Sequence, residues 1–349
     1  MYNKTIVVND IAANPGGGLT VLKEFYDAVK RNKDEINWIF LLSEPYIEET
    51  DKIKVVLLPR IKKHVNRILF DSFAGARIIN KFKPDIVFSL QNTIVYYCKG
   101  RTALYIHQPL PFQNKKKYSF LKKDEFGLAC IQHLLGRRII RSASSSDLCI
   151  VQTKWMEKAV EKKCKCRNIK QIYPNIPSIP NKAKYETTRT FFYPTSTISY
   201  KNNILLENVS KRLLQDGVHI STVFTTEEQD CISGVEHIGR IPMNEVYERL
   251  ETSCLVFPSY IETFGYPLVE AKAIGSLILA SDCEFSHELL DDYKNAYFFN
   301  PFDETDLYNL MKEVALGKIR RIDCTDRKNA ASEQENAWDQ VIEEILSLV

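Results

Sequence analysis

The stretch Tyr173-Pro174-Asn175-Ile176-Pro177-Ser178-Ile179-Pro180-Asn181 divides the chain into two halves of similar pattern. Its three prolines within seven residues favour extended backbone and exclude a helix. On both sides of this stretch, short apolar runs alternate with longer segments of helical periodicity, which is typical of parallel α/β architecture. We therefore predict two Rossmann-like, doubly wound domains, residues 1–178 and 179–329, joined by this linker.

The predicted strands are four to six residues long, and most of the predicted helices span about two turns or more. The strands are Thr5–Val8, Asn37–Leu42, Lys54–Leu58, Ile86–Ser89, Thr102–Ile106, Leu148–Gln152, Thr190–Tyr193, Ile220–Phe224, Val235–Ile238, Cys254–Phe257, Leu277–Ala280 and Ala296–Phe299. The helices are Leu19–Lys30, Asn66–Phe82, Trp155–Lys163, Asn203–Gln215, Met243–Glu251, Pro267–Ile274 and Glu304–Leu316. A last amphipathic helix within residues 330–349 is expected to pack back on the first domain.

Length and composition exclude several classes of protein. With 349 residues, 44% of them hydrophobic, the chain suits two globular domains and not a disordered segment. No apolar run reaches the 18–20 residues of a membrane span, and the N-terminus reads as a buried strand and not as a signal peptide. The net charge of +3 argues against a dedicated nucleic-acid binder. The nine cysteines show no zinc-binding spacing, so we expect free thiols in a reducing cytoplasm.

The predicted domains direct the search for chemistry to residues just after strands, because open α/β sheets bind ligands at the carboxyl ends of their strands. The richest such loop follows the predicted strand Cys254–Phe257. There, Thr263 and Gly265 enter a helix whose N-terminal N–H groups suit a phosphate or diphosphate. Glu262 lies in the loop, and Glu270 follows eight positions later on what we expect to be the first helical turn. One carboxylate would face the reacting end of a ligand, and the other would accept paired hydroxyls.

The run PSYIETFGYPLVEA, residues 258–271, resembles the E-x7-E signature of retaining glycosyltransferases with the GT-B fold, family four, also called glycosyl transferases group 1. The likeness extends in order to Ala280-Ser281-Asp282, Glu288 and Asn300-Pro301. It implies that Glu262 bonds the hydroxyls of the transferred sugar and that Glu270 holds the ribose of the nucleotide. The backbone of Thr263, Phe264 and Gly265, which lie between the two glutamates, would bind the nucleotide-sugar.

A second loop, Tyr193-Pro194-Thr195-Ser196-Thr197-Ile198-Ser199-Tyr200-Lys201-Asn202, follows the first strand of the second domain. Lys201 is placed to neutralise a leaving diphosphate, whose charge grows as the glycosidic bond breaks. The resembled family usually has an Arg…Lys pair in this loop, whereas Ser196 or a neighbour takes the place of the arginine here. Ser196, Lys201 and Asn202 are our candidates for nucleotide-sugar binding, and a solvated surface lysine is the alternative reading.

In the first domain, Gly16, Gly17 and Gly18 follow the first strand and open a helix. Glycines allow positive φ and a close approach of backbone to ligand, although a flexible turn is an equally simple reading. The run resembles the N-terminal glycine loop of the family, which lines the cleft near the diphosphate and the acceptor. His107 ends the strand Thr102–Ile106, where reactive groups cluster, and the resemblance implies a contact with the transferred sugar.

The charge is unevenly distributed. Residues 100–170 carry sixteen basic and five acidic side chains, so this segment is +11 and the remainder of the chain is −8. Aromatic residues interleave with the basic ones, as in Phe112, Tyr118, Phe120 and Phe126. This pattern suits an anionic membrane face, with a solvated basic surface as the alternative. A nucleic-acid partner is not expected, because aromatic-rich RNA-binding signatures are missing.

The sequence as a whole favours a retaining hexosyltransferase that uses a nucleotide-sugar and a glycan or polyprenyl-diphosphate-linked acceptor. By association with the resembled enzymes, we expect a role in lipopolysaccharide or other surface-polysaccharide assembly, in the cytoplasm or peripherally on the inner face of its membrane. No D-x-D pair flanked by strands and no metal-ligand spacing is present, which favours metal-independent transfer without a cofactor. The alternatives are a nucleotide-sugar epimerase of the same fold and a non-catalytic nucleotide-sugar-binding subunit.

Overall fold

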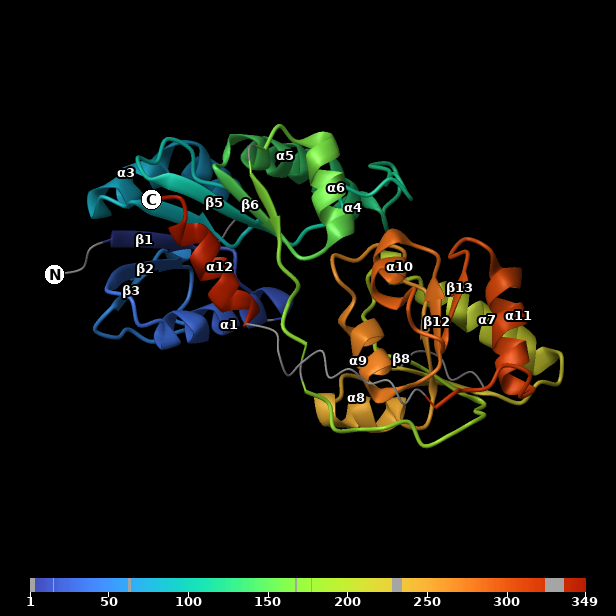
Figure 1. The fold of residues 1–349 in the computed structure, drawn as a ribbon. Coiled ribbons are helices and arrows are strands. Elements are labelled where there is room, and N and C mark those ends of the chain that lie inside the picture. Colours follow the sequence, from blue (N-terminus) through green and yellow to red (C-terminus); the bar gives the residue numbers. More distant parts are fainter. Residues whose placement is uncertain are drawn as a thin grey trace. The chain divides into compact units, whose positions relative to one another are not determined.

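The computed structural model describes residues 4–14, 16–61, 64–166, 168–176, 178–227, 234–323 and 336–349 (Figure 1). The contacts divide the chain into two compact units. Unit 1 comprises Met1–Asn175 and Glu335–Val349, and unit 2 comprises Ile176–Gln334. The division falls inside the proline-rich linker, three residues before the boundary expected from the sequence. No helix in the described ranges combines the length and the apolar character needed to span a bilayer.

Unit 1 contains a seven-stranded, parallel sheet in the order β3-β2-β1-β4-β5-β6-β7. Its strands are β1 (Lys4–Asn9), β2 (Ile36–Leu42), β3 (Ile53–Leu57), β4 (Ile86–Ser89), β5 (Arg101–Ile106), β6 (Leu148–Val151) and β7 (Ile169–Gln171). Its α-helices are α1 (Gly17–Arg31), α2 (His64–Leu69), α3 (Gly75–Ile79), α4 (Phe126–Ala129), α5 (Gly136–Ser145), α6 (Lys154–Lys163) and α12 (Ala337–Leu346). Short 3₁₀ segments, η1 (Pro59–Ile61) and η3 (Asn80–Phe82), and π-helical segments, η2 (Phe70–Ala74) and η4 (Cys130–Leu135), adjoin them.

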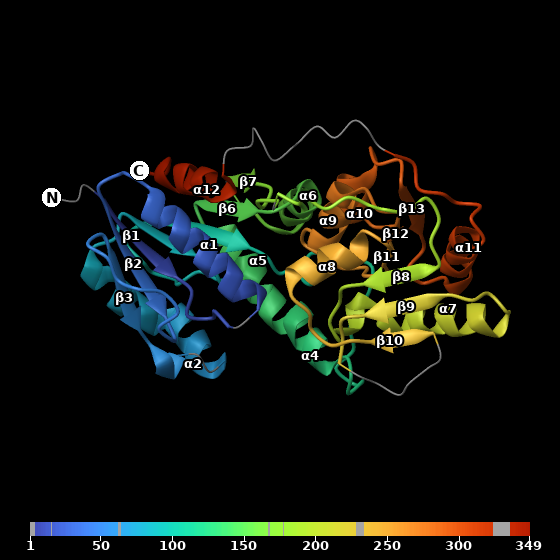
Figure 2. The ribbon, with the colours of Figure 1, turned by 90° about the horizontal axis from the view of Figure 1, so that it is seen from below.

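The two faces of this sheet bury separate apolar cores, because successive side chains of a strand point to opposite faces. Ile6 and Val8 face α1 and α12, whereas Val7 faces the helices that include Phe70 and Ile79. Both views show α1 and α12 side by side (Figures 1 and 2). The C-terminal helix therefore completes unit 1, although residues 330–335 of the expected helix lie outside the described ranges.

Unit 2 contains a six-stranded, parallel sheet in the order β10-β9-β8-β11-β12-β13. Its strands are β8 (Thr190–Tyr193), β9 (Ser221–Phe224), β10 (Val235–His237), β11 (Cys254–Phe257), β12 (Ile278–Ser281) and β13 (Ala296–Phe299). Its helices are η5 (Ser199–Lys201), α7 (Asn203–Gln215), α8 (Met243–Leu250), α9 (Tyr266–Ile274), α10 (Glu284–Leu290) and α11 (Glu304–Ala315). Figure 1 shows α8, α9 and α10 on one side of the sheet and α7 and α11 on the other. Since helices cover both faces, a central strand such as β11 is buried along its whole length.

Both sheets confirm the predicted fold class of two doubly wound units. The elements β7, α5 and α10 were not predicted, and β3 and β12 are displaced by one residue from the predicted strands. The largest difference in a predicted element is the segment Asn66–Phe82, which is not a single regular α-helix, since the π-helical η2 interrupts it. Gly75 follows η2, and a Cβ atom at this position would lie 2.7 Å from a Val95 side-chain carbon. The local helix thus fits a close contact with the segment after β4, which periodicity alone does not reveal.

Trp338 joins α12 to unit 1. Its ring centroid lies 5.6 Å from that of Phe25 and 5.2 Å from that of Tyr105, and its Nε1 donates a 2.9 Å hydrogen bond to Glu24 Oε2. The contacts involve residues more than 200 positions apart in the chain, so α12 depends on tertiary packing and not on local propensity.

Replacing Trp338 by alanine removes this anchor. We expect the Trp338→Ala variant to lose about 3–5 kcal/mol in the free energy of unfolding of unit 1, the usual range for a buried tryptophan. Urea unfolding followed by circular dichroism measures the loss. Val65→Ala, at an exposed position of the same unit, is the matched control and should change stability by less than about 0.5 kcal/mol. Equal losses in the two variants would contradict the assignment of α12 to unit 1.

Candidate functional site

In unit 2, the chain changes direction across the sheet between the neighbouring strands β8 and β11. From β8 the chain runs outward to β9 and β10, and from β11 it runs outward to β12 and β13. Loops that leave adjacent strands in opposite directions open a crevice at their carboxyl ends, where α/β sheets bind ligands. Lys201 lies in η5 after β8, and Glu262 lies in the loop after β11. The fold therefore brings both candidate residues to the switch point of the sheet.

Lys201 and Glu262 form an ion pair. The Lys201 Nζ atom lies 2.5 Å from Glu262 Oε1, and both side chains are largely buried. The Tyr260 N–H donates to the Tyr200 carbonyl at 3.2 Å and ties the two loops together. The Tyr193 hydroxyl donates to the Lys201 carbonyl at 3.0 Å and holds the loop of Lys201 against its own strand, β8. An ammonium carries three N–H donors, so Lys201 can hold Glu262 and a ligand oxygen at the same time.

Asn202 has a structural part in this arrangement. It adopts the left-handed conformation with φ +61°, which asparagine tolerates better than most residues, and it precedes α7. Its side-chain amide donates to the Pro301 carbonyl at 2.8 Å and thereby joins the loop of Lys201 to the loop after β13. Ser196 is exposed at the other end of the same loop, and its carbonyl accepts from Asn203 Nδ2 at 2.9 Å. Contacts of Ser196 and Asn202 with a nucleotide-sugar stay predictions.

The turn into α9 supplies backbone donors beside Glu262. Gly265 precedes the helix with φ +97°, a conformation that other residues rarely adopt, and Pro267 occupies the first turn. The Phe264 ring is buried and stacks edge-on against Tyr266 at 5.1 Å, so Phe264 offers its backbone to the site and its side chain to the core. Thr263 lies between Glu262 and this buried ring. Within the first turn of α9, Pro267 has no N–H and the Leu268 N–H donates to the Gly265 carbonyl at 3.0 Å, so the backbone donors that we expect for an anion are those of the turn before Pro267.

Glu270 lies one residue farther into α9 than the sequence suggested, at the start of the second turn, because the helix begins at Tyr266 and Glu270 is its fifth residue. Its side chain is only 5% exposed, and burial raises the pKa of its carboxyl from 4.5 to about 7. Burial of an ionisable group without a charged partner disfavours its charged form. Such perturbed carboxyls are concentrated at functional sites, which supports a binding role for Glu270.

In unit 1, the glycine run lies at the equivalent switch point, after β1 and at the start of α1. Gly16 has φ +120°, so its backbone strongly favours glycine. A Cβ atom added at Gly16, Gly17 or Gly18 would meet no described atom within 4 Å. Packing within the described residues therefore does not explain Gly17 and Gly18, and a contact of their backbone with a ligand stays a prediction.

His107 follows β5, and a hydrogen bond to Asn92 determines which nitrogen of its neutral ring carries the proton. The backbone N–H of His107 donates to Asn92 Oδ1 at 2.7 Å, which orients the amide so that Asn92 Nδ2 donates to His107 Nε2 at 2.9 Å. The proton of the neutral ring is then on Nδ1, which is buried and has no hydrogen-bond partner among the described protein atoms. Burial lowers the pKa of His107 to about 4, so the ring is neutral at physiological pH and offers one N–H donor.

Sequence reasoning missed two groups at the same edge of unit 1. Asn92, just discussed, adopts φ +67° in the loop after β4. Asp10 directly follows β1, is almost fully buried, and burial raises the pKa of its carboxyl to about 7 despite the charge of Arg67. Its position immediately after the first strand was visible in the sequence, and the rule that drew attention to Glu262 applies to Asp10 equally well.

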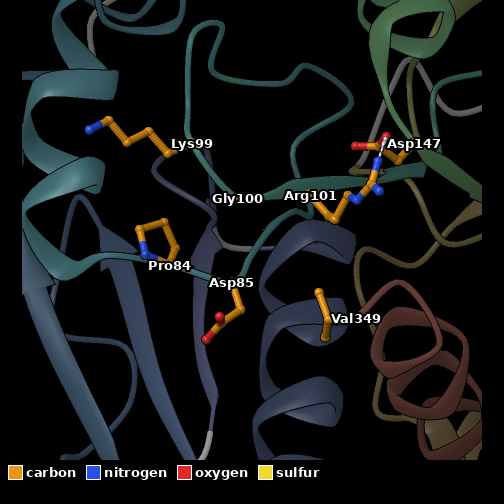
Figure 3. A pocket seen from close by; sticks show the side chains of 7 residues that line it. All are labelled: Pro84, Asp85, Lys99, Gly100, Arg101, Asp147 and Val349. Atoms are coloured by element: carbon orange, nitrogen blue, oxygen red, sulfur yellow. Dashed lines mark hydrogen bonds and ion pairs between the residues drawn. The ribbon is translucent and has the colours of Figure 1, made fainter.

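A depression of about 400 Å³ lies elsewhere on unit 1, at the amino ends of β5 and β6 (Figure 3). Arg101 and Asp147 form an ion pair in it at 3.2 Å. Asp147 also accepts from the Thr102 N–H at 2.8 Å, and Asp85 accepts from the Thr5 N–H at 2.7 Å. Both carboxylates thus accept hydrogen bonds from backbone N–H groups at the amino edge of the sheet. None of the candidate residues lines the depression.

Comparison with known proteins agrees with this architecture. Residues 226–333, which include Glu262 and Glu270, match the family model Glycosyl transferases group 1. The sucrose-phosphate synthase from Thermosynechococcus elongatus superposes with a TM-score of 0.67 at 13% identity, covering 99% of this chain and 95% of that chain. The chain has the GT-B fold. WaaG, a glycosyltransferase involved in lipopolysaccharide biosynthesis, gives 0.66 at 14% identity over 99% of both chains.

A further GT-B neighbour is HepE from Anabaena in complex with UDP and glucose, with a TM-score of 0.65 at 12% identity, covering 99% of this chain and 100% of that chain. No curated protein sequence matches the chain significantly. At these identities, the structural neighbours establish the fold, and the family match covers the part of the GT-B chain that carries the two glutamates.

The buried carboxyl of Glu270 predicts a pH-dependent gain in stability on its removal. Its folded pKa of about 7 lies above the ordinary 4.5, so the folded protein loses stability as the pH rises between these values. We expect Glu270→Gln to raise the free energy of unfolding by about 1–3 kcal/mol at pH 8 and to leave it unchanged at pH 4. Urea unfolding at the two pH values tests this, with Glu245→Gln on the exposed face of α8 as the control. A loss of stability at pH 8 would contradict it.

Proposed function

We propose that the protein is a glycosyltransferase that moves a sugar from a UDP- or GDP-linked donor to a glycan or lipid-linked saccharide, with retention of configuration. The observation that carries the proposal is the Lys201–Glu262 ion pair at the switch point of unit 2, beside the N-terminus of α9. A cation and the backbone of the turn into α9 suit the diphosphate of a nucleotide-sugar, and a carboxylate beside them suits the hydroxyls of its sugar.

On this proposal, each group of unit 2 holds one part of the donor. The carboxylate of Glu270 accepts hydrogen bonds from the paired ribose hydroxyls, and the backbone of the turn into α9, residues 263–265, binds the diphosphate. Lys201 adds a positive charge where negative charge develops as the sugar leaves. Glu262, held by Lys201, accepts hydrogen bonds from hydroxyls of the transferred sugar. The UDP and glucose bound in the HepE structure support a UDP-sugar as the first donor to test.

The proposed reaction proceeds on one face of the sugar. The bond between the anomeric carbon and the diphosphate oxygen breaks, and its electron pair stays on the diphosphate. The acceptor hydroxyl forms the new bond from the same face and gives its proton to the departing diphosphate. In this scheme, Lys201 and the backbone of the turn into α9 stabilise the leaving group, so no resident metal is required. His107 contacts the transferred sugar, and the backbone of Gly16–Gly18 borders the diphosphate and the acceptor.

The pathway and the location belong to the same proposal. WaaG is described as a glycosyltransferase involved in lipopolysaccharide biosynthesis, and WaaB as a lipopolysaccharide outer core galactosyltransferase. We infer a related role for this chain, in the cytoplasm and in the assembly of a surface polysaccharide. The acceptor would then be a saccharide on a lipid carrier, such as polyprenyl diphosphate.

The transfer assay uses purified protein, a set of UDP- and GDP-sugars, and lipid-linked or free saccharide acceptors. A thermal-shift screen selects the donor, since bound ligand stabilises the folded state. We expect release of nucleotide diphosphate that depends on the acceptor. Glu262→Ala and Lys201→Met should each lower kcat by about 10²–10³, whereas Glu245→Ala, an exposed glutamate of α8, should leave it unchanged. Full activity of Glu262→Ala would overturn the proposal.

Two other outcomes of the same assay lead to different functions. Conversion of the donor sugar without any acceptor would indicate an epimerase of the same fold. Binding of the donor without turnover, even with acceptor present, would indicate a non-catalytic nucleotide-sugar-binding subunit. The feature that favours this outcome is the lack, near Ser196, of the arginine that the resembled family usually has.

The pKa of Glu270 predicts how nucleotide affinity depends on pH. The ionised carboxylate is the form that accepts two hydroxyl hydrogen bonds, and its fraction rises as the pH passes through about 7. We expect the Kd of the nucleotide diphosphate to fall by about tenfold between pH 6 and pH 8, in proportion to that fraction. Isothermal titration calorimetry measures it. Glu270→Gln with the same nucleotide is the control, because it retains only the titration of the nucleotide itself. Identical pH profiles would contradict the ribose-binding role.

A further inference from the structure

Unit 1 exposes an unusual set of apolar side chains. Of the eleven large apolar residues that are exposed among its described residues, eight fall in two segments of the chain. The first segment is α2 with η2, and the second is the loop 113–125 with α4 and η4. The eight side chains are Val65, Ile68, Leu69, Phe73, Phe120, Leu121, Phe126 and Leu134, and together they define what we call the apolar-basic surface.

In the first segment, the exposed residues form one stripe. Val65, Ile68, Leu69 and Phe73 follow one another at intervals of three, one and four positions, so they lie on one side of the continuous helical segment α2–η2. Phe70 is buried against the sheet. The segment therefore has two apolar sides, one packed on unit 1 and one exposed, and Val65 is 69% exposed.

In the second segment, a well-anchored loop presents its apolar tip to solvent. Gln132 accepts from the Tyr118 N–H at 2.9 Å and donates to the Lys116 carbonyl at 2.9 Å. The buried Glu125 accepts from the Ser119 N–H at 2.9 Å and pairs with Lys116 at 3.1 Å. Between these anchors, Leu121 is 96% exposed. These hydrogen bonds hold the loop in one conformation, so the exposure of Leu121 does not result from a disordered loop. An exposed apolar side chain at the tip of an ordered loop is typical of a binding surface.

The two segments belong to one side of unit 1. Phe70 of η2 and Ile139 of α5 lie on cores of the same face of the sheet, opposite α1 and α12. An ion pair of 3.3 Å between Arg138 and Asp71 joins α5 to η2. Each segment also begins after the carboxyl end of a strand: α2 follows β3, and the loop 113–125 follows β5. Gly16 and His107 lie at the same carboxyl edge of the sheet.

The sequence around these apolar side chains is rich in lysine and arginine, which indicates an anionic partner. Residues 60–83 carry seven basic and one acidic side chain, and residues 115–141 carry eight basic and two acidic ones. Apolar side chains among lysines and arginines suit a bilayer of anionic lipids, because the apolar groups enter the acyl boundary while the cations remain at the headgroups. A second copy of this chain would oppose one basic surface to another, which like-charge repulsion disfavours.

We propose that the apolar-basic surface docks on an anionic lipid bilayer. Leu121 and Phe120 enter the bilayer at the tip of the loop, the stripe of α2–η2 lies along the headgroup region, and the surrounding lysines and arginines contact the lipid phosphates. The purpose of docking rests on the proposed function, since it would bring the carboxyl edge of unit 1 to an acceptor whose lipid carrier stays in the membrane.

The experiment is cosedimentation of the full chain with vesicles of phosphatidylcholine, with or without one third phosphatidylglycerol. We expect at least tenfold stronger binding to the anionic vesicles and a steep decline as salt is raised, because salt screens headgroup attraction. Leu121→Asp and Val65→Asp should each weaken binding at least tenfold and leave the circular dichroism spectrum unchanged. Leu316→Asp, at a half-exposed position of unit 2, is the matched control and should bind as the unmodified chain does.

Several outcomes would overturn the proposal: no binding to anionic vesicles, equal binding to both kinds of vesicle, or an equal loss in the Leu316→Asp control. Concentration-dependent dimerisation that Leu121→Asp abolishes would indicate instead that the surface joins two copies of the chain, and size-exclusion chromatography without vesicles detects it. Vesicle binding is measured without donor or acceptor, so its result does not depend on the transfer assay. A chain that binds vesicles but transfers no sugar would contradict only the proposed function, and a chain that transfers sugar but binds no vesicles would contradict only the docking proposal.

Discussion

Parallel strand pairing is the constraint on which both units depend. Because all the strands of a sheet run the same way, every loop that leaves a carboxyl end emerges at one edge, and the order of the strands decides which loops are neighbours. The pairing of β8 with β11 brings Lys201 next to Glu262 across 61 positions of sequence. The same order in unit 1 places the glycine run after β1 next to the loop after β4. The order of the strands therefore determines which loops meet in each candidate region, and the side chains of those loops then determine its chemistry.

The two glutamates of unit 2 show how the environment separates chemically identical groups. Glu262 has a counter-ion 2.5 Å away, so its charge is compensated inside the unit. Glu270 is buried in α9, and its pKa rises to about 7 because burial disfavours its charge. A buried carboxyl of this kind opposes folding at neutral pH, and proteins retain such groups mostly where function needs them. The contrast supports one glutamate as part of a fixed ion pair and the other as a group that becomes fully ionised only with a ligand or at higher pH.

Much of the fold could be predicted from the sequence because a buried parallel strand is a short apolar run between turn signals. The predicted strand Cys254–Phe257 and the predicted helix Asn203–Gln215 agree with the structure residue for residue. The π-helical η2 was not predicted, because apolar periodicity does not distinguish it from a regular α-helix. The ion pair of Lys201 and the bond between Asn92 and His107 depend on neighbours across the sheet, so the sequence indicated the residue types but not their partners.

Apolar periodicity has a further limit that α2–η2 makes plain. A stripe such as Val65, Ile68, Leu69 and Phe73 has the spacing of a core-facing helix, and from the sequence alone it would be assigned to the core. In the structure, Phe70 fills the core instead and the stripe is exposed. Periodicity reports that a face is apolar, but not what covers it. The stripe of α2–η2 is not covered by unit 1, and the neighbouring basic loop exposes Leu121 at its tip. Exposed apolar side chains of this kind are typical of a binding surface. The basic charge of the surrounding sequence favours anionic lipid headgroups as the partner over a second copy of the chain.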